Sequence, residues 1–291
     1  MVKKYSERYR EARTAFLTQE TPQDASFYAR NLLSSVTQKR QEELLAKGEM
    51  YASQQQCEAM RLAVNRVLSG EPIAYVLGQW EFYGMTLYVD PNVLIPRDDT
   101  CAVTDLAIKY GLGLETPPRV LDLCTGSGCI GLAVATKIAN AKVVLADVSQ
   151  QALAVAKKNI ALQKLGGRVN TFVSDALQAP SKFLGKFDMI VSNPPYITSG
   201  EMLELPHSVK NYEPHLALFG GEDGLDFYRA ICANYSQCLK PGGYLCFEFG
   251  MCQGDDVCEI LTSNSFTILE RSRDYNDRER AVIARYNRKD G

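Results

Sequence analysis

The sequence predicts an α/β protein in which helices cover both faces of a mostly parallel sheet, preceded by a small all-helical region. Two observations lead to this prediction. Residues 1 to about 70 carry apolar residues at helical spacing only, whereas strand patterns alternate with helical patterns from residue 119 onward. The chain of 291 residues is long enough for two domains of ordinary size.

The N-terminal region is predicted to form a bundle of four helices. The first covers residues 5–17, and Thr21 followed by Pro22 is typical of an N-cap and the first position of a second helix. A third run around Leu44 and a fourth over residues 53–68 follow. The mixed charges of this bundle fit a solvated face as well as a face that docks a partner.

Residues 71–97 are rich in glycine, proline and aromatic residues. They predict a linker that runs into a short β-hairpin. A helix is expected over residues 101–110, and Pro117 and Pro118 then mark the entry to a new unit.

The rest of the chain alternates strands and helices. Strands are expected at 119–123, 141–147, 169–175, 187–193 and 243–250, and helices at 129–139 and 149–163. In the first of these helices, Ile130, Ala133, Val134 and Ile138 are expected to form one apolar stripe. Residues 281–286 follow a polar loop and predict an antiparallel strand that closes the sheet.

The composition is that of a soluble globular enzyme, with 46% hydrophobic and 23% charged residues. No apolar stretch is long enough for a membrane helix, and the N-terminus lacks the apolar segment of a secretory signal, so we expect a cytoplasmic protein. A net charge of -2 argues against duplex nucleic acid as a partner. The nine cysteines include no CxxC pair, which predicts reduced, buried thiols and no metal site.

A turn of small residues lies between the strand at 119–123 and the following helix. Its residues are Cys124, Thr125, Gly126, Ser127 and Gly128. Such a turn lets the backbone approach a ligand, and the helix N-terminus offers free N–H groups. Asp147 ends the next strand, where an acidic residue suits a ribose diol. Together these features predict a nucleoside site.

The expected nucleoside carries a cationic group. A phosphate-binding GxxxxGK[ST] loop is absent, and Asp122, just before the turn, is expected to form an acidic rim that would repel a pyrophosphate. S-adenosylmethionine, with its sulfonium and ammonium groups, suits such a rim. The turn and Asp122 resemble motif I of the class I methyltransferases, and Asp147 resembles their ribose-binding acid.

Asn193, Pro194, Pro195 and Tyr196 follow the fourth predicted strand. Two consecutive prolines fix the backbone and remove two donors, so the carbonyls there are free acceptors. An amide or aromatic amine nitrogen is a poor nucleophile because its lone pair is delocalised. The Asn193 side-chain oxygen and the Pro194 carbonyl are expected to accept both hydrogens of such an NH2 group, and Tyr196 to stack on it. This motif is typical of amino-methyltransferases in general, those of DNA adenine and cytosine included.

Further segments narrow the resemblance. Residues 71–84 and 93–97 resemble the linker of the bacterial glutamine N5-methyltransferases that modify peptide chain release factors. Residues 213–218, 220–224 and 273–280 resemble other parts of the same family. The resemblance implies a Rossmann-like domain at 98–291 with a seven-stranded, mostly parallel sheet. It also implies a linker and hairpin at 71–97 and a substrate-docking helical domain at 1–70.

The resemblance also implies the reaction. The methyl donor would be S-adenosyl-L-methionine, the product S-adenosyl-L-homocysteine, and the acceptor the glutamine of the Gly-Gly-Gln motif in class 1 release factors. The residues of the motif at 193–196 would be catalytic. The turn at 124–128, Asp147, Asp175, Ala176 and Asn193 would contact the cofactor.

Several positions depart from the family pattern. The linker reads IPRDDTC where IPRPxTE is usual, so any role for an acid at Cys101 is lost. Cys124 stands where glycine is common, so the turn must accommodate a Cβ atom. Ala176 stands where an aromatic residue is frequent, which removes a stacking contact to adenine. Asn276 replaces a usual glycine and is expected to tolerate a left-handed backbone.

Alternative functions are a glutamine methyltransferase acting on a ribosomal protein and, more distantly, an amino-methyltransferase acting on nucleic acid. The sequence offers neither a large Lys/Arg cluster nor a spare domain for nucleic-acid recognition. A binding module without turnover would leave the intact motif at 193–196 unexplained. We expect a monomer with a protein substrate and no membrane partner.

Overall fold

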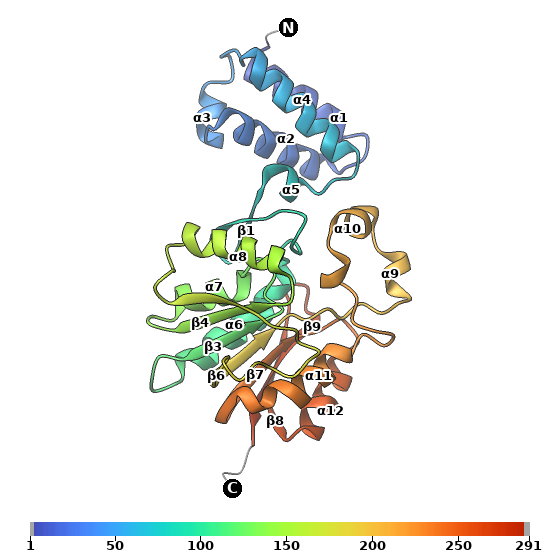
Figure 1. The fold of residues 1–291 in the computed structure, drawn as a ribbon. Coiled ribbons are helices and arrows are strands. Elements are labelled where there is room, and N and C mark those ends of the chain that lie inside the picture. The colour runs from blue at the N-terminus through green and yellow to red at the C-terminus, as the bar shows by residue number, and fades with distance from the viewer. Residues whose placement is uncertain (1–2, 288–291) are drawn as a thin grey trace. The chain divides into compact units, whose positions relative to one another are not determined.

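The computed structural model describes residues 3–287 and divides the chain into two compact units, each described here by itself (Figure 1). The helical unit runs to Gln79 and includes residues His207–Tyr212. The sheet unit begins at Trp80 and holds the rest. The first two and last four residues of the domain ranges expected from the sequence lie outside the described part.

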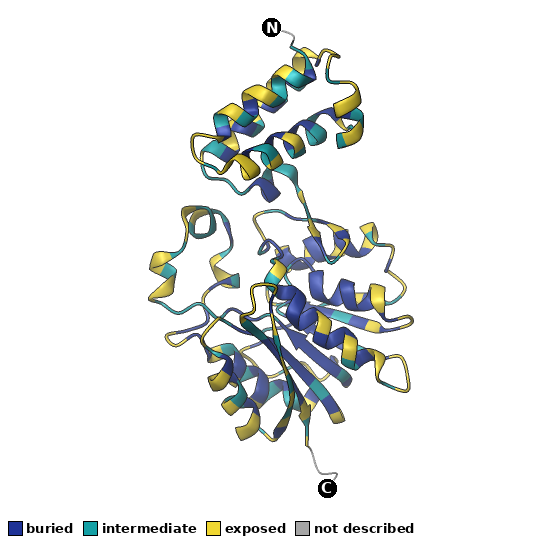
Figure 2. Cartoon of the chain, turned by 180° about the vertical axis from the view of Figure 1, so that it is seen from behind, coloured by how far each residue is buried: buried dark blue, intermediate teal, exposed yellow. Residues whose placement is uncertain are grey.

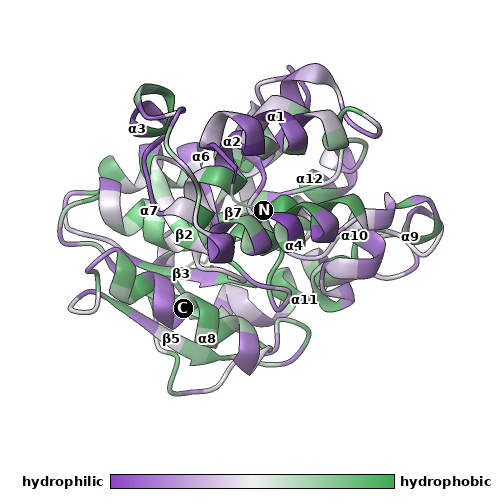
Figure 3. Ribbon diagram, turned by 90° about the horizontal axis from the view of Figure 1, so that it is seen from above, coloured by the Kyte–Doolittle hydropathy of each residue, from purple (hydrophilic) through white to green (hydrophobic). Residues whose placement is uncertain are grey.

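The helical unit contains the four helices predicted from the sequence and two others. Its helices are α1 (Tyr5–Phe16), α2 (Pro22–Thr37), α3 (Gln41–Ala46), α4 (Gln54–Leu68), α5 (Ile73–Leu77) and α10 (His207–Tyr212). The Thr21 hydroxyl accepts a hydrogen bond from the Asp24 N–H and caps α2, as its place before Pro22 predicted. The unit extends past residue 70 because α5 packs against α2 and α4. The outer faces of α1 and α2 are mainly hydrophilic (Figure 3).

The sheet unit has a seven-stranded sheet in the order β5-β4-β3-β6-β7-β9-β8, beside a two-stranded hairpin of β1 and β2. The strands are β1 (Gln79–Phe82), β2 (Met85–Tyr88), β3 (Arg119–Leu123), β4 (Lys142–Asp147), β5 (Val169–Val173), β6 (Phe187–Ser192), β7 (Leu239–Glu248), β8 (Phe266–Arg273) and β9 (Glu279–Tyr286). The helices are α6 (Cys101–Leu112), α7 (Cys129–Lys137), α8 (Gln150–Leu162), α9 (Glu201–Glu204), α11 (Asp226–Tyr235) and α12 (Gly254–Ser263). Strands β3 to β7 pair in parallel, and β9 is antiparallel to both neighbours, as predicted for residues 281–286.

Two hydrophobic clusters cover the two faces of the sheet. One joins α6, α7 and α8 to one face, and the other joins α11 and α12 to the opposite face. Successive strand residues alternate between the clusters, so Val120 belongs to the first and Leu121 to the second. The central strands β3 and β6 are buried from both sides, whereas the outward faces of the helices are exposed (Figure 2). The predicted α/β class and the seven-stranded sheet are confirmed.

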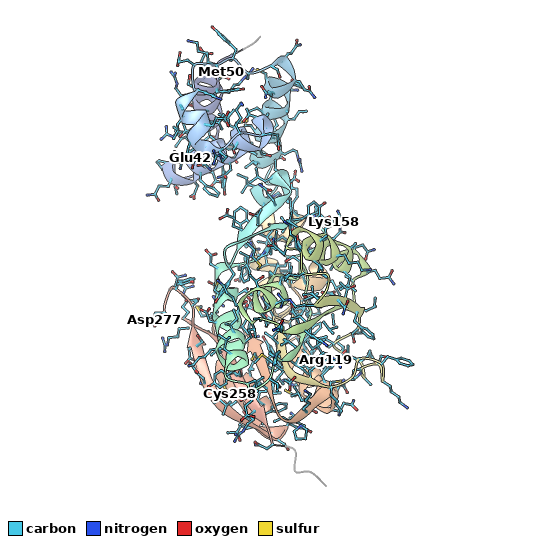
Figure 4. All side chains as sticks on the ribbon, turned by 90° about the vertical axis from the view of Figure 1, so that its left-hand side faces the viewer. Glu42, Met50, Arg119, Lys158, Cys258 and Asp277 are labelled. Atoms are coloured by element: carbon cyan, nitrogen blue, oxygen red, sulfur yellow. The ribbon has the colours of Figure 1, made fainter. Side chains whose placement is uncertain are left out.

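Several elements differ from the sequence-based expectation. Sequence analysis did not predict α5, β8 or the helices between residues 200 and 265. In α7 burial extends beyond the expected stripe, because all residues from Cys129 to Ala135 are buried between α6 and the sheet. Asn276 does not take the left-handed backbone. Its neighbour Asp277, which is labelled in Figure 4, does, and its φ is 59°.

The nine cysteines are all free thiols, and six of them are buried. Within residues 3–287, no group of three or more His, Cys, Asp or Glu side chains is arranged to hold a metal ion. Over the same range, the structure contains no helix with the length and hydrophobicity needed to span a membrane.

Candidate active site

A pocket opens at the carboxyl ends of β3, β4 and β6, where the order of the parallel strands reverses direction. Crevices of this kind are where α/β sheets bind ligands. Of the residues predicted from the sequence, the pocket is lined by Cys124, Thr125, Gly126, Ser127, Asp147, Asp175, Ala176, Asn193 and Pro195. Gly128, Pro194 and Tyr196 are not among its lining residues.

Asp122 stabilises the glycine turn that follows β3. This carboxylate accepts hydrogen bonds from the Thr125 hydroxyl at 2.6 Å and from the Gly131 N–H at 2.9 Å. Asp122 is fully buried, and burial raises its pKa to about 7. The expectation that it forms an acidic rim is therefore wrong. Its position on β3 directs it toward α7, where it joins the turn to the first residues of that helix.

Cys124 occupies the left-handed region of the backbone, with φ of 59°. Its side chain lines the pocket and packs against the second core cluster. Glycine adopts this conformation without steric cost, whereas a Cβ atom strains it. Cys124 therefore keeps the backbone conformation that favours glycine, at the cost of local strain.

We expect Cys124→Gly to change the free energy of unfolding by no more than about 1 kcal/mol, because released strain offsets lost side-chain packing. Cys124→Val should lower it by about 2 kcal/mol or more, because a β-branched side chain is an outlier at this φ. Urea unfolding of both variants measures the difference. Equal stability of the glycine and valine variants would show that the turn is unstrained.

Asp147 lies at the end of β4 and faces the turn. Its Oδ2 atom accepts from the Gly126 N–H at 2.9 Å, and its Oδ1 atom accepts from the Ser149 N–H at 2.9 Å. Burial raises the pKa of this carboxyl group above its ordinary value, while these backbone donors oppose the rise. Each carboxylate oxygen keeps a further lone pair, so Asp147 can still accept hydrogen bonds from a diol.

The lining of the pocket is more apolar than expected. Asp175 and Ala176 line it as predicted, and Ala176 is 3% exposed. Leu177 and Phe227 also line the pocket, although sequence analysis did not select them. A flat, apolar ring therefore has aliphatic and aromatic neighbours even without an aromatic residue at position 176.

Asn193 directly follows β6 and lines the pocket. Its Nδ2 atom donates to the Thr100 hydroxyl at 3.3 Å. No residue from 3 to 287 donates a hydrogen bond to its Oδ1 atom. Tyr196 packs against the second core cluster, and the Gln253 amide donates to its carbonyl at 3.0 Å. The Asn193 oxygen thus remains an available acceptor beside the pocket.

The backbone after Asn193 is braced by a glycine-containing segment. The Ile197 N–H donates to the Leu218 carbonyl and the Gly220 N–H donates to the Ile197 carbonyl, both at 2.9 Å. A Cβ atom on Gly220 would lie 2.6 Å from the Pro195 carbonyl oxygen and 2.6 Å from the Tyr196 Cα atom. No side chain fits there without moving the proline motif.

We expect Gly220→Ala to lower kcat at least about tenfold, because a displacement of the proline motif by a fraction of an ångström misaligns Asn193. Gly166→Ala is the matched control, since a Cβ atom at that position meets nothing within 4 Å. Steady-state kinetics of both variants provide the measurement. Full activity of Gly220→Ala would mean that this close approach does not position the motif.

Sequence analysis missed the wall formed by residues 92–100. Glu213 is 4% exposed, accepts from the Ile95 N–H at 3.1 Å and pairs with the Arg97 guanidinium. Arg280 joins Asp99 at 3.1 Å to Asp274 at 3.0 Å. These ion pairs connect segments that the sequence analysis quoted for their resemblance but to which it gave no structural role.

Three features define this protein as a methyltransferase of the Rossmann-like class. They are the antiparallel strand β9, the pocket at the point where the strand order reverses, and the glycine turn that lines this pocket. A family model described as Methyltransferase small domain matches residues 111–207, and one described as PrmC N-terminal domain matches residues 9–78.

The curated relatives agree with this class, and a solved structure shares the fold. The chain is 40% identical to the Release factor glutamine methyltransferase of Clostridium acetobutylicum, over 73% of this chain and 74% of that protein. It is 35% identical to the protein of the same name from Chlorobaculum tepidum, over 92% of both. The hMettl16 catalytic domain shares the fold with a TM-score of 0.56 at 14% identity, covering 83% of this chain and 86% of that one. The chain belongs to the release factor glutamine methyltransferase family.

Proposed function

We propose that this protein transfers a methyl group from S-adenosylmethionine to the side-chain N5 atom of the glutamine in the Gly-Gly-Gln motif of class 1 peptide chain release factors. One observation carries the proposal most directly. Asn193 lines the pocket together with the residues of the glycine turn, and no described residue donates to its Oδ1 atom. The names of the relatives support the choice of substrate.

The residues of the pocket fit the proposed methyl donor. The Ser127 hydroxyl is buried without a hydrogen-bond partner among the described residues, so it can serve a polar group of a ligand. Asp147 can accept both hydroxyls of a ribose, and Leu177 and Phe227 can cover the faces of an adenine ring. S-adenosylmethionine, when bound, supplies a methyl group on a positively charged sulfur atom.

The proline motif fits the proposed acceptor. A glutamine side-chain nitrogen has two hydrogens and a delocalised lone pair. The Asn193 Oδ1 atom and the Pro194 carbonyl would each accept one of these hydrogens, which orients the nitrogen for in-line attack. This positioning would be worth several kcal/mol, up to about 7–11 kcal/mol for well-oriented groups. The nitrogen becomes acidic once it is alkylated, so the site needs no strong base.

The helical unit is proposed to dock the release factor. Exposed apolar side chains lie on this unit, with Leu45 81%, Tyr51 63% and Leu62 51% exposed. A protein partner would cover these side chains on binding. The near-neutral net charge of -2 also favours a protein over a nucleic acid as partner. The active form is proposed to be a monomer.

Competition between acceptors tests the substrate class. We expect labelled methyl groups from S-adenosylmethionine to appear on a class 1 release factor and not on ribosomal proteins or single-stranded DNA offered at equal concentration. A release factor with its Gly-Gly-Gln glutamine replaced is the control and should remain unlabelled. Preferential labelling of a ribosomal protein or of DNA would replace the proposal with one of those alternatives.

A further inference from the structure

The buried carboxyl group of Glu248 lies on the strand next to Asn193 and has no part in the reaction described above. Glu248 ends β7, and the register of β6 and β7 pairs Ser192 with Phe247, so Asn193 and Glu248 follow on neighbouring strands. Glu248 is 1% exposed, and its Oε2 atom has no hydrogen-bond partner among residues 3–287. Glu248 is not a lining residue of the pocket, so any action on a substrate passes through a neighbour.

Glu248, Thr100 and Asn193 form a small polar cluster. Burial raises the pKa of the Glu248 carboxyl group, and Thr100 and Asn193 lie close enough for their side chains to oppose this rise. The Asn193 Nδ2 atom also donates to the Thr100 oxygen at 3.3 Å. An ionised carboxylate only accepts hydrogen bonds, so a Thr100 hydroxyl beside Glu248 would turn its hydrogen toward the carboxylate. The Thr100 oxygen is then left to accept from Asn193.

The direction of these bonds matters because an asparagine amide has two orientations of nearly the same shape. With Oδ1 toward the pocket, Asn193 accepts a hydrogen from the substrate NH2 group. With Nδ2 toward the pocket, the Asn193 NH2 group would face the substrate NH2 group, and two donors cannot form a hydrogen bond. A threonine hydroxyl alone does not select between the two, because it both donates and accepts.

We propose that Glu248 is a positioning residue that fixes the side-chain amide of Asn193 with Nδ2 turned inward and Oδ1 facing the substrate. The proposal rests on the amide-methylating function proposed above. It assigns a role to a buried charge that would otherwise be costly to keep in this position.

The orientation depends on the charge of Glu248. Burial raises the pKa of Glu248 to about 7. The titratable or charged groups that face it are Cys101 on α6, Cys129 on α7, Tyr196 after β6, Tyr228 on α11, Arg280 on β9 and Asp99 before α6. Burial raises the pKa of each of these thiols and phenols, so they stay neutral near pH 7, and Arg280 is paired with Asp99.

The ionised form of Glu248 is therefore the orienting form. It predominates above the pKa and is lost as the pH falls below about 7. The kcat of the wild-type protein should accordingly rise with pH through this value. The KM for the release factor should change much less, because docking uses other surfaces.

Glu248→Gln tests the proposal, because glutamine keeps the shape of the side chain but both donates and accepts. We expect kcat to fall on the order of 10-fold or more, with the KM for the release factor little changed and the low-pH limb of kcat absent. Glu270→Gln on β8 makes the same chemical change at a surface ion pair with Lys109 and should match the wild type. Calorimetric binding of S-adenosylhomocysteine should be the same for all three proteins.

A second variant keeps the test decisive if Glu248→Gln folds poorly. Thr100→Val removes the hydroxyl, and the double variant should be no slower than the slower single variant because the two residues act on one amide. If the factors by which the two single substitutions lower kcat multiply in the double variant, the proposal is wrong. It is also wrong if Glu248→Gln has the kcat and the pH profile of the wild type. Failure of the wild-type protein to methylate the release factor would instead count against the proposed function.

Discussion

Asn193→Ala should lower kcat on the order of 100- to 1000-fold, the cost of removing one preorganised hydrogen-bond partner from an active site. The side chain reaches the pocket, and its Oδ1 atom is free of any described donor. Without it, a substrate amide keeps only one acceptor and its nitrogen is poorly oriented. The affinity for S-adenosylhomocysteine, measured by calorimetry, should stay close to that of the wild type.

Asn170→Ala is the control for this variant, since Asn170 is an exposed residue of β5. It should retain full activity. If Asn193→Ala kept wild-type kcat, the amide of Asn193 could not be the group that orients the acceptor nitrogen. A loss of cofactor affinity equal to the loss of activity would place Asn193 in cofactor binding alone.

Asp147→Ala should show the opposite pattern, with affinity for S-adenosylhomocysteine reduced on the order of 100-fold. The substitution removes the proposed ribose acceptor together with the bonds from the Gly126 and Ser149 N–H groups. Hydrogen bonds to a charged group are stronger than neutral ones, so their loss has a large effect. At saturating cofactor, kcat should recover much of its wild-type value.

Asp256→Ala serves as the control, because Asp256 is an exposed aspartate on α12. Its affinity for S-adenosylhomocysteine should equal that of the wild type. Wild-type affinity of Asp147→Ala would contradict a ribose-binding role for the carboxylate at the end of β4. Measuring kcat at several cofactor concentrations separates this variant from Asn193→Ala.

The elements that sequence analysis predicted are those determined by local patterns. The N-cap at Thr21, the turn at Cys124–Gly128 and the strand ends at Asp147 and Asn193 each depend on a few neighbouring residues. Parallel strands bring their carboxyl ends to one edge, so residues at two strand ends meet in one pocket. The same rule predicts that Asp147 and Asn193 lie in one site.

The features that sequence analysis missed depend on contacts between distant segments. Glu213 accepts from the backbone of Ile95, 118 residues away. Asp122 and Glu248 follow apolar residues on buried strands, and only the three-dimensional packing shows which helices cover them. The same holds for Gly220, whose importance lies in its close approach to Pro195 and not in its own conformation.

The most direct test of the proposed function is mass spectrometry of a class 1 release factor after incubation with the protein and S-adenosylmethionine. We expect one added methyl group, located by fragmentation on the side chain of the Gly-Gly-Gln glutamine, and none with Asn193→Ala. An unmodified glutamine after incubation with folded, cofactor-binding wild-type protein would contradict the proposal, and so would a methyl group located on any other residue.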